Sequence, residues 1–191
     1  MATVRSGQQA ALLIVDVQVG VVREAWQVPR VVANLVGAVA RARAAGVPVI
    51  WIQHDDDELP KGSADWAWVP ELVPAPGEAQ IHKQHNSGFE ATPLEAVLAE
   101  QGVSHLVLGG AFSQWCIRAT AYAALERGYD LTLLSDAHTN GGCELDDGRR
   151  TDAGDIVAEL NKAMSWLSYP GRRNRALPSV ALDFADLATL A

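Results

Sequence analysis

The chain has 191 residues, of which 49% are hydrophobic, and its formal net charge is −8. This length and hydrophobic content suit one folded domain over residues 1–191 and exclude a generally disordered chain. The acidic balance and the lack of a basic run argue against a nucleic-acid partner. No apolar run reaches membrane-spanning length, so we expect no membrane partner. The N-terminus has no apolar leader, and Cys116 and Cys143 form no paired motif, which together predict a reduced, cytoplasmic protein.

Short aliphatic runs predict buried strands, and alanine-rich stretches that end at glycine predict helices. In chain order, the strands are expected at residues 10–16, 47–53, 79–83, 106–108, 131–135 and 179–182. The helices are expected at residues 31–45, 93–101, 114–127 and 152–167. The segments 54–77 and 140–148 have no period and predict ordered loops. Strands that alternate with helices predict an α/β fold with a parallel sheet in three layers.

Three chemically useful segments follow predicted strands. Asp16 and Lys83 stand at strand ends, and the turn 111–116 follows the strand at 106–108. In open parallel sheets, ligands bind beyond the carboxyl ends of the strands. These segments are therefore expected to meet at one edge of the sheet.

Cys116 is expected in the first turn of a helix. In this interpretation Gly109 and Gly110 break the preceding strand, and Ser113 is the N-cap. The unpaired N–H groups and positive dipole end of a first helical turn favour a thiolate and a nearby oxyanion. The alternative is that Cys116 is a small core hydrophobe, which is the usual fate of a free cysteine.

A cysteine nucleophile needs a base to accept its proton and a cation to stabilise the thiolate. Asp16 suits the first role and Lys83 the second. Each residue also has an ordinary explanation, because an aspartate at a strand end is commonly a turn residue and a lone lysine is usually solvated. The residues alone leave both interpretations of this triad open.

Several segments, occurring in order over residues 10–167, resemble the isochorismatase-like cysteine hydrolases, a superfamily of isochorismatase- and nicotinamidase-related amidohydrolases. They are Leu12–Gln18, Val49–His54, Gly62–Ser63, Pro70–Pro74, Gly77–Glu78, His82–Lys83, Leu94–Gly102, Gly110–Ala111, Cys116–Ile117 with Thr120, and Gly128–Thr139. The resemblance implies a Rossmann-like α/β fold with a mostly parallel six-stranded sheet. It also implies a homo-oligomer, a dimer or tetramer.

The same resemblance implies a catalytic triad of Asp16, Lys83 and Cys116. In the family the thiolate attacks an amide or related carbonyl to give an acyl-enzyme, the aspartate moves the proton to the departing amine, and water releases the acid. The family also has a non-proline cis peptide before the cysteine, which here corresponds to Ala111–Phe112. It would direct the backbone N–H of Phe112, with that of Cys116, at the oxyanion. No cofactor is expected.

The chain departs from the family before the cysteine, where Phe112 and Ser113 replace the usual glutamine and threonine. The metal-binding spacing of nicotinamidases is not reproduced around His54, so we expect an acidic solvated loop there and no metal. The candidates for substrate contact are Gln18, Trp66, Phe89, Phe112 and Trp115. The aromatic members predict a pocket with apolar walls, and packing is the alternative for each.

These observations favour a cysteine-dependent hydrolase of a small, non-peptide amide, lactam or ureide, with an amide-bearing small molecule as its partner. Vinyl-ether hydrolysis of isochorismate is a second interpretation, which Cys116 disfavours because relatives of that type generally lack the cysteine. A third is a catalytically silent binding protein with the same fold. Phe112 and Ser113 leave that interpretation open.

Overall fold

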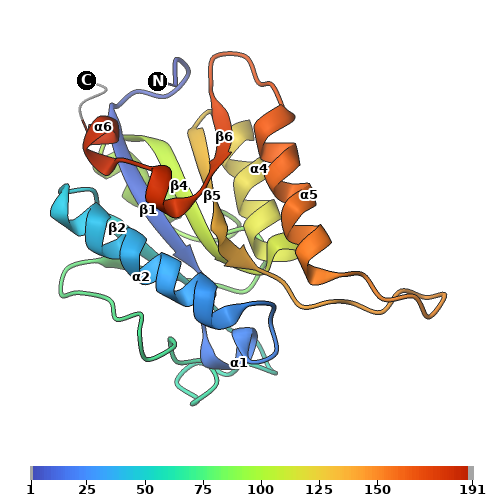
Figure 1. The fold of residues 1–191 in the computed structure, drawn as a ribbon. Coiled ribbons are helices and arrows are strands. Elements are labelled where there is room, and N and C mark those ends of the chain that lie inside the picture. The colour runs from blue at the N-terminus through green and yellow to red at the C-terminus, as the bar shows by residue number, and fades with distance from the viewer. Residues whose placement is uncertain (1, 189–191) are drawn as a thin grey trace.

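The computed structural model describes residues 2–188 as a six-stranded parallel sheet with helices on both faces (Figure 1). The strands are β1 (Gln9–Val15), β2 (Val49–His54), β3 (Ala79–Lys83), β4 (Val103–Ala111), β5 (Asp130–Thr139) and β6 (Asn174–Leu177). They lie in the order β3-β2-β1-β4-β5-β6, and every neighbouring pair is parallel. The predicted three-layer α/β fold is confirmed.

The helices are α1 (Val19–Val22), α2 (Val28–Ala44), α3 (Leu94–Glu100), α4 (Arg118–Glu126), α5 (Ala153–Trp166) and α6 (Phe184–Ala188). A π-helical turn, Ser113–Ile117, precedes α4, and a 3-10 turn, Ser179–Ala181, precedes α6. Helices α2 and α6 cover one face of the sheet, and α3, α4 and α5 cover the other (Figure 1). None of the helices within residues 2–188 is long and apolar enough to cross a membrane.

The central strand β1 shows why the inner strands of the sheet are continuous aliphatic runs in the sequence. Leu12 and Ile14 pack into the core beneath α2, whereas Leu13 and Val15 pack into the core on the opposite face. A strand buried on both faces has no polar side to alternate with its apolar side. The edge strand β6 is only partly buried.

The structure corrects two boundaries around the sheet. Gly109 and Gly110 do not break β4, which runs to Ala111. They instead allow a close approach of neighbouring strands, because a Cβ at Gly110 would lie 2.0 Å from the Val15 carbonyl oxygen of β1. Gly110 also has a φ of +132°, which favours glycine. The last strand is β6 at Asn174–Leu177, and the predicted strand at 179–182 is a 3-10 turn followed by the buried Leu182.

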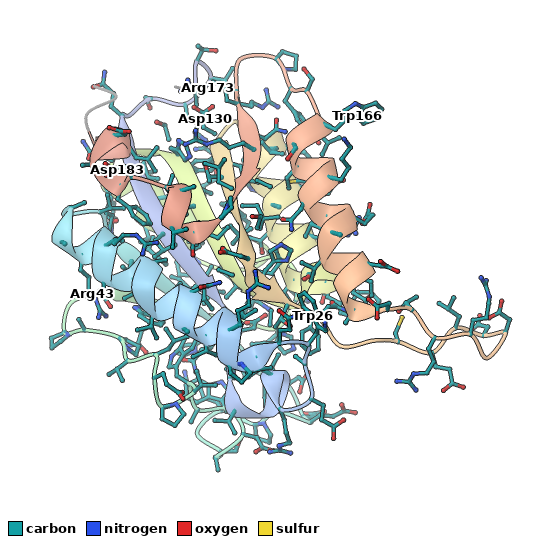
Figure 2. The ribbon with its side chains drawn as sticks, viewed as in Figure 1. Trp26, Arg43, Asp130, Trp166, Arg173 and Asp183 are labelled. Carbon is teal, nitrogen blue, oxygen red and sulfur yellow. The ribbon has the colours of Figure 1, made fainter. Side chains whose placement is uncertain are left out.

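The two ends of the sheet differ in their surroundings (Figure 2). Asp130 and Arg173 lie together at the amino end of β5, and Trp26 lies at its carboxyl end. There the Trp26 N–H donates to the Asn140 carbonyl at 3.0 Å, so the chain after α1 is fixed against the segment that follows β5. The candidate site lies at this carboxyl end.

Candidate active site

Asp16, Lys83 and Cys116 come together at the carboxyl edge of the sheet. Asp16 follows β1 with a φ of +53°, and its N–H continues the sheet by donating to the Ile52 carbonyl at 2.8 Å. Lys83 is the last residue of β3, and its Nζ lies 2.7 Å from Asp16 Oδ2 and 3.2 Å from Cys116 Sγ. Cys116 comes from the π-helical turn after β4. Three separate strand ends thus supply an acid, a cation and a thiol.

Asp16 and Lys83 form a buried ion pair, with 1% and 2% of their surfaces exposed. Burial raises the pKa of Asp16, although the Lys83 ammonium and a hydrogen bond from it oppose that shift. Burial also acts to lower the pKa of Lys83, but the charges of Asp16 and Cys116 outweigh it, so the pKa of Lys83 is raised. The lysine therefore stays cationic while the aspartate becomes a better proton acceptor than an exposed one.

The Cys116 thiol is not the low-pKa thiolate that its expected position in a helix predicts. Burial, together with the Asp16 carboxylate, raises the pKa of Cys116 to about 12, against the opposing influence of Lys83. The expectation is corrected for two reasons. Cys116 lies in a π-helical turn rather than an α-helical one, and desolvation of the sulfur outweighs the helix dipole. The raised pKa favours the protonated thiol over the thiolate.

Ser113 holds this turn from inside the protein. Its Oγ donates to the Thr139 carbonyl at 2.9 Å and lies 2.8 Å from His138 Nδ1, so it does not cap the helix as predicted. Asn140 takes over part of that role, because its Oδ1 accepts the Gln114 N–H at 3.1 Å. The segment that follows β5 therefore fixes the turn that carries the cysteine.

Phe112 has the backbone geometry that the resemblance predicts. The Ala111–Phe112 peptide bond is cis. The Phe112 carbonyl accepts the N–H groups of Trp115 and Ile117 at 3.0 and 3.1 Å. Its own N–H has no hydrogen-bond partner within residues 2–188. An unengaged N–H at the start of the turn is available to an incoming oxyanion.

The proposed substrate contacts Gln18 and Trp66 lie close to the triad, but both are engaged with the protein. Gln18 is fully buried; its amide donates to the carbonyls of His54 and Trp66 at 2.9 and 3.0 Å and accepts the His54 N–H at 2.9 Å. The Trp66 ring lies 5.4 Å from the His82 ring. Gln18 therefore ties β2 to the long loop, and Trp66 covers the end of β3.

The other three aromatic candidates do not form one wall. The Phe89 ring packs on Tyr129 at 5.8 Å, near the far end of α4. Trp115 is 53% exposed on the outer side of the turn. Phe112 packs against the core beneath α2.

A pocket of about 380 Å³ beside Phe112 has polar residues at its rim rather than aromatic ones: Arg23, Glu24 and Arg150. The candidates therefore do not line one common pocket, and Trp115 instead lines a separate cavity of about 340 Å³ together with Tyr122.

His54 is a site residue whose place beside Lys83 the sequence did not reveal. It ends β2 in register with Lys83, and its Nδ1 lies 3.3 Å from Lys83 Nζ. In the sequence it appears only as a possible metal ligand beside an acidic run. The available signal was its position at a strand end between those of Asp16 and Lys83 in the sheet order, which requires the topology to be known.

The isochorismatase domain profile matches residues 10–151. The chain therefore belongs to the isochorismatase family of hydrolases.

Two streptothricin hydrolases from Streptomyces noursei are 39% and 37% identical to it over 137 residues, which is 67% of this chain. The chain spans about half the length of these curated relatives, 49% and 53% respectively.

Solved structures agree on the fold. An isochorismatase from Pseudomonas putida KT2440 superposes with a TM-score of 0.82 at 25% identity, over 92% of this chain and 90% of that one. A cysteine hydrolase from Pseudomonas syringae pv. phaseolicola gives a TM-score of 0.84 at 18% identity, over 96% and 94% of the two chains. At that identity the second likeness concerns the fold alone.

Proposed function

We propose that this chain hydrolyses a small, non-peptide amide, lactam or ureide through a covalent acyl-enzyme on Cys116. The observation that carries the proposal is the placement of Lys83 Nζ 2.7 Å from the buried Asp16 carboxylate and 3.2 Å from Cys116 Sγ. Asp16, Lys83 and Cys116 are the catalytic residues in this scheme. The site needs no cofactor for this chemistry.

The first step transfers the thiol proton as the carbon–sulfur bond forms. The thiol pKa of about 12 leaves almost no thiolate in the resting enzyme, so a base must act during the attack. Asp16 is that base, because burial raises its pKa and makes its carboxylate a stronger acceptor. Lys83 stabilises the sulfur as negative charge develops on it. The carbonyl oxygen becomes an oxyanion, which the N–H groups of Phe112 and Cys116 receive.

The second step breaks the carbon–nitrogen bond. Protonated Asp16 gives its proton to the departing amine, which leaves as a neutral group, and the carbonyl carbon stays bonded to Cys116 Sγ. A water molecule then attacks the thioester, and Asp16 accepts its proton. Collapse of that second intermediate releases the acid and returns the proton to the thiol.

The relatives suggest where a substrate search should start. The two Streptomyces noursei proteins are named for streptothricin. Streptothricin is therefore the first compound to test, followed by simple amides, lactams and ureides. The polar rim of the pocket beside Phe112 supports a substrate with charged or hydrogen-bonding groups over a purely apolar one.

The test compares the Cys116→Ala and Cys143→Ser variants. Loss of the nucleophile should lower turnover by roughly 10⁴-fold or more, and the wild-type protein should show a trapped acyl group on the Cys116 peptide by mass spectrometry. Cys143 is a matched control, since it is the other free cysteine and its Sγ contacts Thr151 Oγ1 at 3.2 Å and Gln114 Oε1 at 4.0 Å rather than Lys83. Retained turnover in Cys116→Ala with an unchanged melting temperature would refute the acyl-enzyme.

A further inference from the structure

Lys83 has a polar partner besides Asp16, with which it forms an ion pair, and Cys116, to which it donates a hydrogen bond. The side chain of His54 lies between the buried ion pair and the protein surface, with Nδ1 3.3 Å from Lys83 Nζ and Nε2 3.0 Å from Asp56 Oδ2. A lysine ammonium carries three N–H donors and no acceptor. Two of these donors face the sulfur of Cys116 and the imidazole nitrogen of His54, and the Asp16 carboxylate holds the ammonium as an ion pair at 2.7 Å.

These partners determine the protonation of His54. Because Lys83 can only donate, Nδ1 of His54 must be an unprotonated acceptor. The proton then lies on Nε2, where the Asp56 carboxylate accepts it. The ring is thus neutral and held in one tautomer. A neutral acceptor engages a hydrogen of Lys83 without cancelling its positive charge, which a second carboxylate would do.

Hydrogen bonds from the rest of the protein fix both the backbone of His54 and the carboxylate of Asp56. The buried amide of Gln18 binds the backbone N–H and carbonyl of His54, each at 2.9 Å. Asp56 Oδ1 accepts the N–H groups of Glu58 and Leu59 at 2.9 and 2.8 Å, which fixes the carboxylate that orients the ring. The ring therefore has a preset position before any substrate binds.

We infer that His54 is a positioning residue that aims an N–H of Lys83 at the Cys116 sulfur, and that Asp56 selects the tautomer it needs. The ion pair with Asp16 fixes the position of the ammonium, and the bond to His54 fixes its rotation, which leaves another N–H directed at the Cys116 sulfur. This inference rests on the proposed cysteine chemistry. It adds a residue outside the triad and a surface carboxylate to the groups that control the thiol.

The test measures alkylation of Cys116 by iodoacetamide at one fixed pH, in a Cys143→Ser background. It requires no substrate, so its outcome is separate from the test of amide hydrolysis. His54→Leu removes the acceptor and should slow alkylation about tenfold, as expected for the loss of one hydrogen bond to a charged group. His54→Asn places an amide oxygen near the position of Nδ1 and should stay within about threefold of the wild-type rate.

Two further variants complete the design. Asp56→Ala frees the tautomer and should slow alkylation about threefold; Asp56 is half-exposed, so this variant is also informative if His54→Leu does not fold. His85→Leu is the matched control, because His85 is an exposed histidine in the loop after β3, and it should react at the wild-type rate.

The inference is overturned if His54→Leu, or Asp56→Ala where the former does not fold, reacts at the wild-type rate. It is also overturned if His54→Asn is as slow as His54→Leu, since a merely structural role would not distinguish the two.

Discussion

Two networks of polar side chains, here called the charged chain and the neutral chain, meet at the turn that carries Cys116. They differ in charge and in where they end. The charged chain runs from Asp16 through Lys83 and His54 to Asp56 at the surface. The neutral chain consists of Ser113, His138 and Asn161. In it His138 Nδ1 lies 2.8 Å from Ser113 Oγ, and His138 Nε2 lies 3.0 Å from Asn161 Oδ1.

The difference suggests that the charged chain serves catalysis and the neutral chain serves the stability of the turn. The charged chain contains an ion pair whose burial is costly, so it is expected to lower stability in exchange for a reactive thiol. The neutral chain satisfies buried polar groups and joins the π-helical turn to β5 and α5, and Asn161 closes it by donating to the Ser135 carbonyl at 2.9 Å. We therefore expect changes in the first chain to abolish activity, with a loss of stability where a buried charge is left unpaired, and changes in the second to lower stability while activity is largely kept.

Removing one member of the charged chain should have the largest effect. Lys83→Met leaves the Asp16 charge buried without its partner, so the free energy of unfolding should fall by about 3–5 kcal/mol, and turnover should fall by roughly 10²–10³-fold or more. The measurements are urea unfolding at neutral pH and a hydrolysis assay.

The double variant Asp16→Asn with Lys83→Met sharpens the comparison. It removes both charges, and asparagine tolerates the positive φ at residue 16. Stability should return to within about 1 kcal/mol of wild type while activity stays absent. Activity in the double variant would contradict a catalytic role for the ion pair. A double variant as unstable as Lys83→Met would show instead that the ion pair is needed for stability.

The neutral chain should make stability depend on pH. Burial lowers the pKa of His138 from its ordinary value of 6.5 to about 4. Between these values the unfolded chain binds a proton that the folded chain does not, so the free energy of unfolding decreases as the pH falls from above 6.5 towards 4. The full difference amounts to about 3 kcal/mol, at 1.36 kcal/mol per pKa unit.

Unfolding curves at neutral and mildly acidic pH test this expectation. His138→Asn cannot titrate and keeps a polar side chain beside Ser113 Oγ, so its stability should depend less on pH than that of the wild type. His105 is the comparison, because burial also lowers its pKa to about 4 and it lies outside both chains. Asp16 acts in the opposite direction, since its pKa is raised. Parallel pH curves for wild type and His138→Asn would show that His138 is not a source of the acid sensitivity.

The ends of the strands show how much of the fold and of the candidate site could be predicted from the sequence. The strand at 79–83 has the predicted bounds. The positions of Asp16, Lys83 and the turn before Cys116 relative to the strands were predicted from the residue pattern, whereas the triad itself came from the family resemblance. β6 was missed because an edge strand with the sequence Asn-Arg-Ala-Leu has no aliphatic run.

Features that depend on tertiary approach could not be predicted from the local pattern. Gly110 of β4 is needed because Val15 of the neighbouring strand approaches its backbone closely. The raised pKa of the Cys116 thiol comes from burial, which the helix-dipole argument ignores. His54 depends on the register between β2 and β3 and on the partner of each ring nitrogen.

The smallest effect is expected from Ser113→Ala, which breaks the neutral chain without touching the charged one. His138 Nδ1 and the Thr139 carbonyl would lose a buried partner, so the free energy of unfolding should fall by about 1–3 kcal/mol. Turnover should fall less than tenfold, since Asn140 still holds the Gln114 N–H. Ser165→Ala is the matched control: its Oγ bonds an α5 carbonyl in an exposed position, and it should change stability by less than about 0.5 kcal/mol. If Ser113→Ala instead loses activity as severely as Lys83→Met while remaining stable, the neutral chain takes part in the chemistry, and the separation between the two chains fails.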